Sequence, residues 1–113
     1  MAASAIPNLT LGIFATAALG QFQAVTVGGV IATAAGNAVG FTQTSGVIGD
    51  RVPVTAGGTA IATASAAIAV GAAVEVVGAA GQVVTRTAGV TVGRALTAAS
   101  AAGDQIEVLV IAN

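Results

Sequence analysis

The sequence predicts an all-β protein, a barrel or sandwich built from short strands. Sixteen glycines divide the chain at the close intervals that are typical of turns between strands. The runs between these glycines are rich in β-branched residues, and several of them alternate in character as half-buried strands do. Near the C-terminus the pair Gly103 and Asp104 has the chemistry of a tight turn and leads into a hydrophobic run at 106–111. With 113 residues, the chain has room for one compact domain.

The first 20 residues differ in texture from the rest of the chain. They show no clean hydrophobic period and few turn signals. Residues 1–20 are therefore expected to form an N-terminal arm or the first strand of the domain, and the sequence leaves both alternatives open. The domain itself is expected to span residues 21–113.

From residue 21 onward, the strand candidates lie between glycines. Pro53 cannot donate a backbone hydrogen bond to a neighbouring strand, so the run 51–54 that contains it is expected at a sheet edge or at the start of a strand. The alternation of Ile61 and Thr63 with alanines predicts a strand to about Thr63, followed by a loop or short helical turn near 65–69. The other candidate strands are 24–27, 51–54, 74–77, 82–87, 90–95 and 106–111.

The composition predicts a homo-oligomer. Hydrophobic residues make up 56% of the chain and charged residues only 6%, but aromatic residues are just 3%. Alanine and valine remove little area from water on burial, while ordering each residue still costs about 1 to 2 kcal/mol. A lone monomer is expected to be marginally stable and to leave much apolar surface exposed, which is typical of surface hidden in an assembly.

The residues for enzymatic chemistry are absent. The chain has no His, Cys, Tyr, Trp or Lys, so the usual general bases, thiol nucleophiles and Schiff-base amines are missing. The four acidic residues are dispersed, without the close spacing of a metal-binding loop. We expect no enzyme, no cofactor and no metal site.

Charge and hydropathy argue against two further classes of partner. A net charge of −1 with three arginines gives no electrostatic footprint for nucleic acid. Pro7, Asn8 and Gly20 interrupt the only apolar stretch that is long enough to suggest a membrane span. Arg94, on a predicted strand, is the candidate for an ion pair between subunits, although an exposed arginine of little energetic weight is the simpler interpretation.

Several short segments, in order, resemble the capsid cement (decoration) proteins of tailed bacteriophages. Each segment alone is weak evidence, but their order and spacing over residues 39–109 are more specific. One departure is that Ala72 follows Gly71, where members of that family often carry an acid. The matching segments are Val39-Gly40, Gly49-Asp50-Arg51-Val52-Pro53-Val54, Gly57-Gly58-Thr59-Ala60, Ile68-Ala69-Val70-Gly71, Val74-Glu75-Val76, Gly81-Gln82-Val83-Val84, Val92-Gly93-Arg94-Ala95-Leu96 and Gly103-Asp104-Gln105-Ile106-Glu107-Val108-Leu109.

The resemblance implies a compact β-barrel or β-tulip-like domain that assembles as a homotrimer on the outer surface of the virion capsid. The implied partner is the major capsid protein, whose neighbouring subunits the trimer would bridge after head expansion. The family transfers no catalytic residues. On this interpretation the apolar side chains of the arm are expected to contact the capsid, namely Ile6, Leu9, Leu11, Ile13 and Phe14.

Two other classes of function stay open at this stage. A secreted or fibre-type structural protein that assembles with itself would share the richness in Ala, Val, Gly and Thr. A binding module for a small ligand or carbohydrate is less favoured, because Trp and Tyr, the usual stacking residues, are absent.

Overall fold

Strands and connecting loops make up the described chain. A computed structural model describes residues 5–33, 37–78 and 80–111, and no helix occurs among them. The prediction of an all-β fold is confirmed, and the sheet forms a nearly closed antiparallel barrel. Its eight strands are β1 (Pro7–Phe14), β2 (Ala24–Val25), β3 (Gly40–Thr42), β4 (Arg51–Thr63), β5 (Ala73–Val77), β6 (Gln82–Thr85), β7 (Gly93–Ala95) and β8 (Gln105–Val110).

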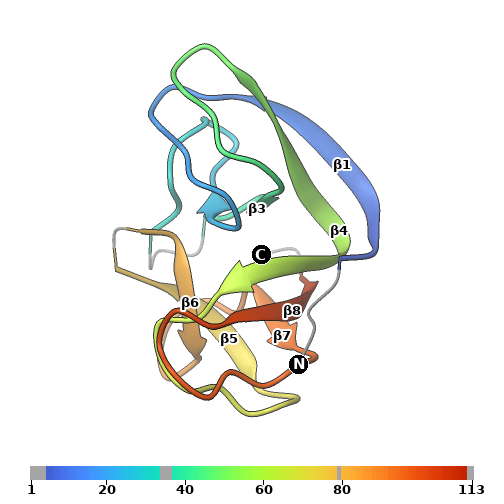
Figure 1. Ribbon diagram of the computed structural model, residues 1–113, viewed down its shortest axis with the longest axis vertical. Helices are drawn as coiled ribbons and strands as arrows, with labels where there is room; N and C mark the ends of the chain where they lie inside the picture. Colours follow the sequence, from blue (N-terminus) through green and yellow to red (C-terminus); the bar gives the residue numbers. More distant parts are fainter. Residues whose placement is uncertain (1–4, 34–36, 79, 112–113) are drawn as a thin grey trace.

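The long strand β4 joins two lobes (Figure 1). Its first half pairs with β1 on one edge and with β3 on the other, and β2 continues from β3; we call this part lobe A. Its second half pairs with β8, and the order continues through β7 and β5 to β6; we call this part lobe B. The N–H of Ser65, just after β4, donates to the carbonyl of Val83 in β6 at 2.9 Å, which brings the ends of lobe B together.

The chain turns from one lobe to the other at Gly57 and Gly58. Gly58 has φ +79°, a left-handed conformation that favours glycine. A Cβ atom at Gly58 would press against the carbonyl oxygen of Ile6 and lie 2.8 Å from the nitrogen of Asn8. The register of β1 against β4 shifts at this point. The glycine pair is therefore required by the close approach of the two strands at the corner.

The two lobes repeat one structural pattern. In each lobe, two loops each follow a strand and end in a tight turn that leads to the next strand. One residue of each of these loops pairs with one residue of the other loop in an isolated β-bridge. Leu19 and Gly46 form the bridge in lobe A, and Ile68 and Ala99 form it in lobe B, each with two backbone hydrogen bonds of 2.9 Å. We call the four tight turns that follow, at residues 20–23, 47–50, 69–72 and 101–104, the corner turns. Thus β1, β2, β3 and the first half of β4 correspond to the second half of β4, β5, β7 and β8.

The third residue of every corner turn has a positive φ. Glycine occupies this position in three of the turns, at Gly49, Gly71 and Gly103, while Phe22 occupies it in the first with φ 60°. In three turns a side-chain oxygen of the fourth residue accepts a hydrogen bond from the N–H of the first. The donor and acceptor pairs are Gly20 to Gln23 at 2.7 Å, Val47 to Asp50 at 3.0 Å and Ala101 to Asp104 at 3.2 Å. Ala72, in the remaining turn, has no such oxygen.

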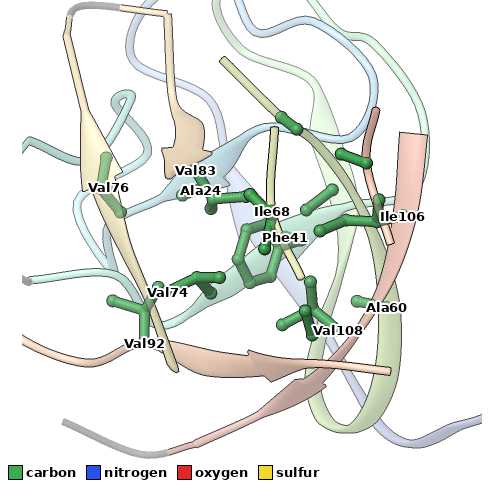
Figure 2. Packing of buried hydrophobic residues seen from close by; sticks show 14 of the residues in the cluster. Ala24, Phe41, Ala60, Ile68, Val74, Val76, Val83, Val92, Ile106 and Val108 are labelled. Carbon is green, nitrogen blue, oxygen red and sulfur yellow. The ribbon is translucent and has the colours of Figure 1, made fainter. Parts of the chain in front are cut away.

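The hydrophobic core has two clusters. Phe41, a fully buried residue of β3 in lobe A, lies in the larger cluster, where Figure 2 shows it among Ile68, Val74 and Val108 of lobe B. Because a lobe A strand supplies this central side chain, the larger cluster joins the two lobes. The smaller cluster, inside lobe A, consists of Ile13, Ala15, Leu19, Val25, Val52 and Val54.

Several expected elements differ in detail from the structure. Residues 7–14, within the segment expected to be an arm or a first strand, pair with β4. β3 was not expected, and β4 continues from the predicted 51–54 run to Thr63 without a break. Pro53 is the third residue of β4, near its start, although this strand has partners on both edges. Residues 65–69 form a loop with a bridge at Ile68, and not a helical turn.

Candidate interaction surface

Three of the four acidic side chains accept hydrogen bonds from backbone N–H groups of nearby loops. The carboxylate of Asp104 accepts hydrogen bonds from the N–H and hydroxyl of Ser100 at 2.8 and 2.9 Å, and these bonds lower the pKa of Asp104. The carboxylate of Glu75 accepts one from the N–H of Thr87 at 2.6 Å, which lowers the pKa of Glu75. Asp50 caps its corner turn, as described above. These carboxylates act as structural caps on loops.

The three arginines bind backbone carbonyl groups within the chain. Arg86 donates to Gly89 at 2.8 Å, and Arg94 donates to Gly71 at 2.7 Å. Arg51 makes a longer contact of 3.4 Å with the carbonyl of Gly12. Arg94, the predicted subunit-bridging residue, is exposed on β7 next to β8, and its role between subunits stays a prediction.

The described residues contain no cluster for metal chemistry. Within residues 5–33, 37–78 and 80–111, no group of three or more His, Cys, Asp or Glu side chains lies close enough to hold a metal ion. In the same residues no helix is long and apolar enough to cross a membrane.

Of the five predicted capsid-contact residues, three have exposed side chains and two have buried or partly buried ones. Ile6, just before β1, is 68% exposed, and Leu9 and Phe14 in β1 are 51% and 58% exposed. In contrast, Ile13 is only 9% exposed within the lobe A core, and Leu11 is partly buried against that core. Leu11 and Ile13 therefore have partners inside the chain, and three apolar side chains are left facing outward.

A further apolar surface lies at the end of lobe A that is farthest from lobe B, and sequence reasoning missed it. The N–H of Ala15 donates to the carbonyl of Asp50, and the N–H of Thr16 donates to the carbonyl of Gly29. These bonds place Phe14 between the 26–30 loop and the second corner turn. The exposed apolar residues of this surface, which we call the lobe A tip, are Phe14, Val27, Val30, Val47 and Ile48.

One charged group lies at the lobe A tip against an aromatic ring. Phe14 and Arg51 are cross-strand partners in the β1 and β4 ladder. The guanidinium carbon of Arg51 lies 4.3 Å from the centre of the Phe14 ring, which is a cation–π contact. The stacking holds the cation in place beside the apolar side chains of the lobe A tip.

A cavity of about 290 Å³ lies where the two lobes meet. None of the described residues that line it has a titratable side chain, so these residues lack the groups for acid-base chemistry. Its lining includes Phe22, whose positive φ is uncommon for an aromatic residue. Other lining residues from both lobes are Pro7, Gln43, Thr55, Ala60 and Ile61.

A comparison with family models shows which family the chain belongs to. The model described as phage cement protein matches residues 4–110. The chain belongs to the phage cement protein family. Membership identifies it as a structural protein that associates with the phage capsid and stabilises it. The match includes β1 and both lobes, so the segment expected to be an arm lies almost wholly within the family's pattern. No curated protein is similar enough to count as a match.

Proposed function

We propose that this chain binds the outer surface of a phage head as a homotrimer and stabilises the expanded shell by bridging neighbouring major capsid subunits. The observation that carries the proposal is the family match over residues 4–110. Two features of the chain support it independently. The side chains of Asp50, Glu75 and Asp104 bind their own loops, while large apolar side chains stay exposed at the lobe A tip and around β1.

Binding to many equivalent positions makes a modest interface effective. A protein that binds the assembled shell, and not its separated subunits, stabilises the shell by mass action. Each chain of a trimer adds a further contact at high effective concentration, so avidity exceeds the affinity of one chain. Exposed apolar side chains suit such contacts because their burial requires no desolvation of charge.

We assign the capsid contact to Ile6 and Leu9, the exposed apolar residues at the start of β1 and just before it. Both lie near the corner of β4, where the N–H of Ile6 donates to the hydroxyl of Thr59 at 2.7 Å. Leu11 and Ile13 contribute indirectly, since their burial fixes β1 on the lobe A core.

Binding to expanded, undecorated phage heads tests the proposal. Purified protein is mixed with heads, the heads are pelleted, and the bound chains are counted. We expect saturable binding in multiples of three for the natural chain and much weaker binding for Ile6→Asp and Leu9→Asp. Val90→Asp, at an exposed apolar site in the loop before β7, is the matched control and should bind normally. Absence of binding by the folded natural chain would reject the proposed function, whereas normal binding by both Ile6→Asp and Leu9→Asp would reject only the contact assignment.

A fibre-type structural protein that assembles with itself is the second candidate. One observation favours it: among the described strands, β1 pairs only with β4, which leaves its other edge open to another chain. Thioflavin-positive fibrils formed by the purified protein would support this candidate. A soluble oligomer of fixed size that binds heads would exclude it.

A further inference from the structure

We propose that the lobe A tip of one copy docks into the cavity between the lobes of a second copy, with Arg51 facing Glu107 of the partner subunit. The proposal rests on the homotrimer of the proposed function, and it names the surfaces that join the subunits. It follows from two complementary features of the same chain, a projecting apolar tip with a cation and a recess with an anion at its rim.

The projecting feature is centred on Ile48. This side chain is 72% exposed at the second corner turn, and the neighbouring Val47 is also exposed. The turn is fixed in shape, because the carboxylate of Asp50 accepts a hydrogen bond from the N–H of Val47 and the N–H of Gly49 donates to the carbonyl of Ala15 at 2.8 Å. A rigid turn loses little conformational freedom when it docks, which favours binding.

Among the described residues, the cation of this tip has no strong hydrogen-bond partner. Arg86 and Arg94 each donate to a carbonyl oxygen at less than 3 Å, whereas the one side-chain hydrogen bond of Arg51 in this part of the chain is 3.4 Å long. Its contact with the Phe14 ring orients the guanidinium group without neutralising its charge. The tip therefore favours a partner that combines apolar side chains with a carboxylate.

The recess offers that combination. Ile61 lines the cavity, and its cross-strand partner in β8 is Glu107. Residues directly opposite in an antiparallel pair lie on the same face of the sheet, so Glu107 stands at the cavity rim. In the part of the chain that the structure describes, Asp50, Glu75 and Asp104 use their carboxylates in hydrogen bonds to loops. The side chain of Glu107 makes no hydrogen bond there, although its backbone N–H donates to Thr97.

Opposite charges and apolar side chains on both features favour a second copy as the occupant. The tip carries the weakly bound cation Arg51 beside Phe14, Val47 and Ile48, and its exposed acid, Asp50, is already hydrogen-bonded to the N–H of Val47. The rim carries the weakly bound anion, and Phe22 and Ile61 are among the apolar residues of the recess. Because the tip and the recess are different surfaces, the contact is head-to-tail, and such contacts generate rings when the rotation closes. In a ring of three, every chain would use one tip and one recess, and no tip would stay exposed.

The test is the mass of the protein in solution without heads, measured by sedimentation for the natural chain and its variants. The natural chain should have three times the 10.5 kDa chain mass. Ile48→Asp should yield monomers, because it places a charge against apolar residues of the recess such as Phe22 and Ile61. Arg51→Glu and Glu107→Arg should each raise the dissociation constant at least about tenfold, and the double variant should recover most of the loss, because it restores opposite charges.

The chain supplies matched controls for both kinds of change. Val70 precedes Gly71 in the third corner turn as Ile48 precedes Gly49 in the second, and it is 64% exposed. Val70→Asp should leave the trimer intact, and so should Arg86→Glu, a charge reversal far from the tip. Thermal melting of each variant shows whether it is folded.

Four outcomes would overturn the proposal. They are a monomeric natural chain, a trimer of normal affinity in Ile48→Asp, no recovery in the double charge reversal, and equal dissociation by Val70→Asp. If the natural chain is monomeric but Ile48→Asp loses binding to heads, the tip serves the capsid and not a second copy. A monomeric natural chain would also reject the homotrimer of the proposed function, whereas binding of the natural chain to heads is tested separately.

Discussion

Replacing Gly58 with alanine tests whether the close approach at the β4 corner is required for the fold. Gly58 has φ +79°, and a left-handed conformation costs a non-glycine residue about 1 to 2 kcal/mol. The added Cβ atom would also meet the carbonyl oxygen of Ile6 and the nitrogen of Asn8. Moving β1 away would weaken the bonds between Ile6 and Thr59, of 2.7 and 3.0 Å, each worth about 1 kcal/mol. We therefore expect Gly58→Ala to lower the free energy of unfolding by about 3 to 4 kcal/mol.

Gly71→Ala, in the third corner turn, is the matched control for this prediction. Gly71 has φ +87°, and a Cβ atom there would have no neighbour within 4 Å, so the variant bears the conformational cost alone. We expect it to lose about 1 to 2 kcal/mol. Urea unfolding at one fixed protein concentration measures both variants, because the stability of an oligomer depends on concentration. If the two variants lose the same free energy, the contact between β1 and the corner does not have the role that we give it.

Two further predictions concern the corner turns. The hydrogen bonds from Ser100 hold the pKa of Asp104 below its ordinary value, so their stabilising effect is complete above about pH 4 and is lost as the pH falls through the lowered pKa. In Asp104→Asn the free energy of unfolding should therefore decrease less as the pH is lowered than in the natural chain, and an unchanged pH profile would contradict this. Part of the decrease should remain, because the pKa of Glu75 is also lowered in the folded chain. Ala72→Asp should supply the missing acceptor of the third turn and raise the free energy of unfolding by about 0.5 to 1 kcal/mol in urea titrations; a loss of stability would contradict this reasoning.

The parts of the fold predicted from the sequence were those with local signals. Gly103 and Asp104 form a turn that leads into β8, and the alternation around Val74 and Val76 corresponds to alternate burial along β5. Two strands had no such signal. In β1 even the apolar Leu9 is exposed, so the strand lacks the alternation of buried apolar and exposed polar residues that would mark it in the sequence. The strand is held instead by pairing with β4, a segment about 40 residues away. β3 is three residues long, too short to show a period.

The interaction surface was predicted less completely. Apolar residues near the N-terminus were identified, but their type does not show which face of β1 they occupy, so buried Ile13 and exposed Phe14 were grouped together. The signal for the lobe A tip was present in the sequence: Val47 and Ile48 directly precede Gly49 and Asp50, at the apex of a turn where polar residues are usual. The repeat of the corner turns could not be predicted from the sequence. The four turns share a positive φ at the third residue, and three of them share a hydrogen bond to the side chain of the fourth, but different residue types occupy these positions.

Calorimetry of expanded heads, with and without saturating protein, tests most directly whether this chain stabilises the phage shell. We expect a higher melting temperature for decorated heads, and a smaller increase for Leu9→Asp at the same protein concentration. Heads that bind the protein to saturation yet melt at an unchanged temperature would contradict this expectation.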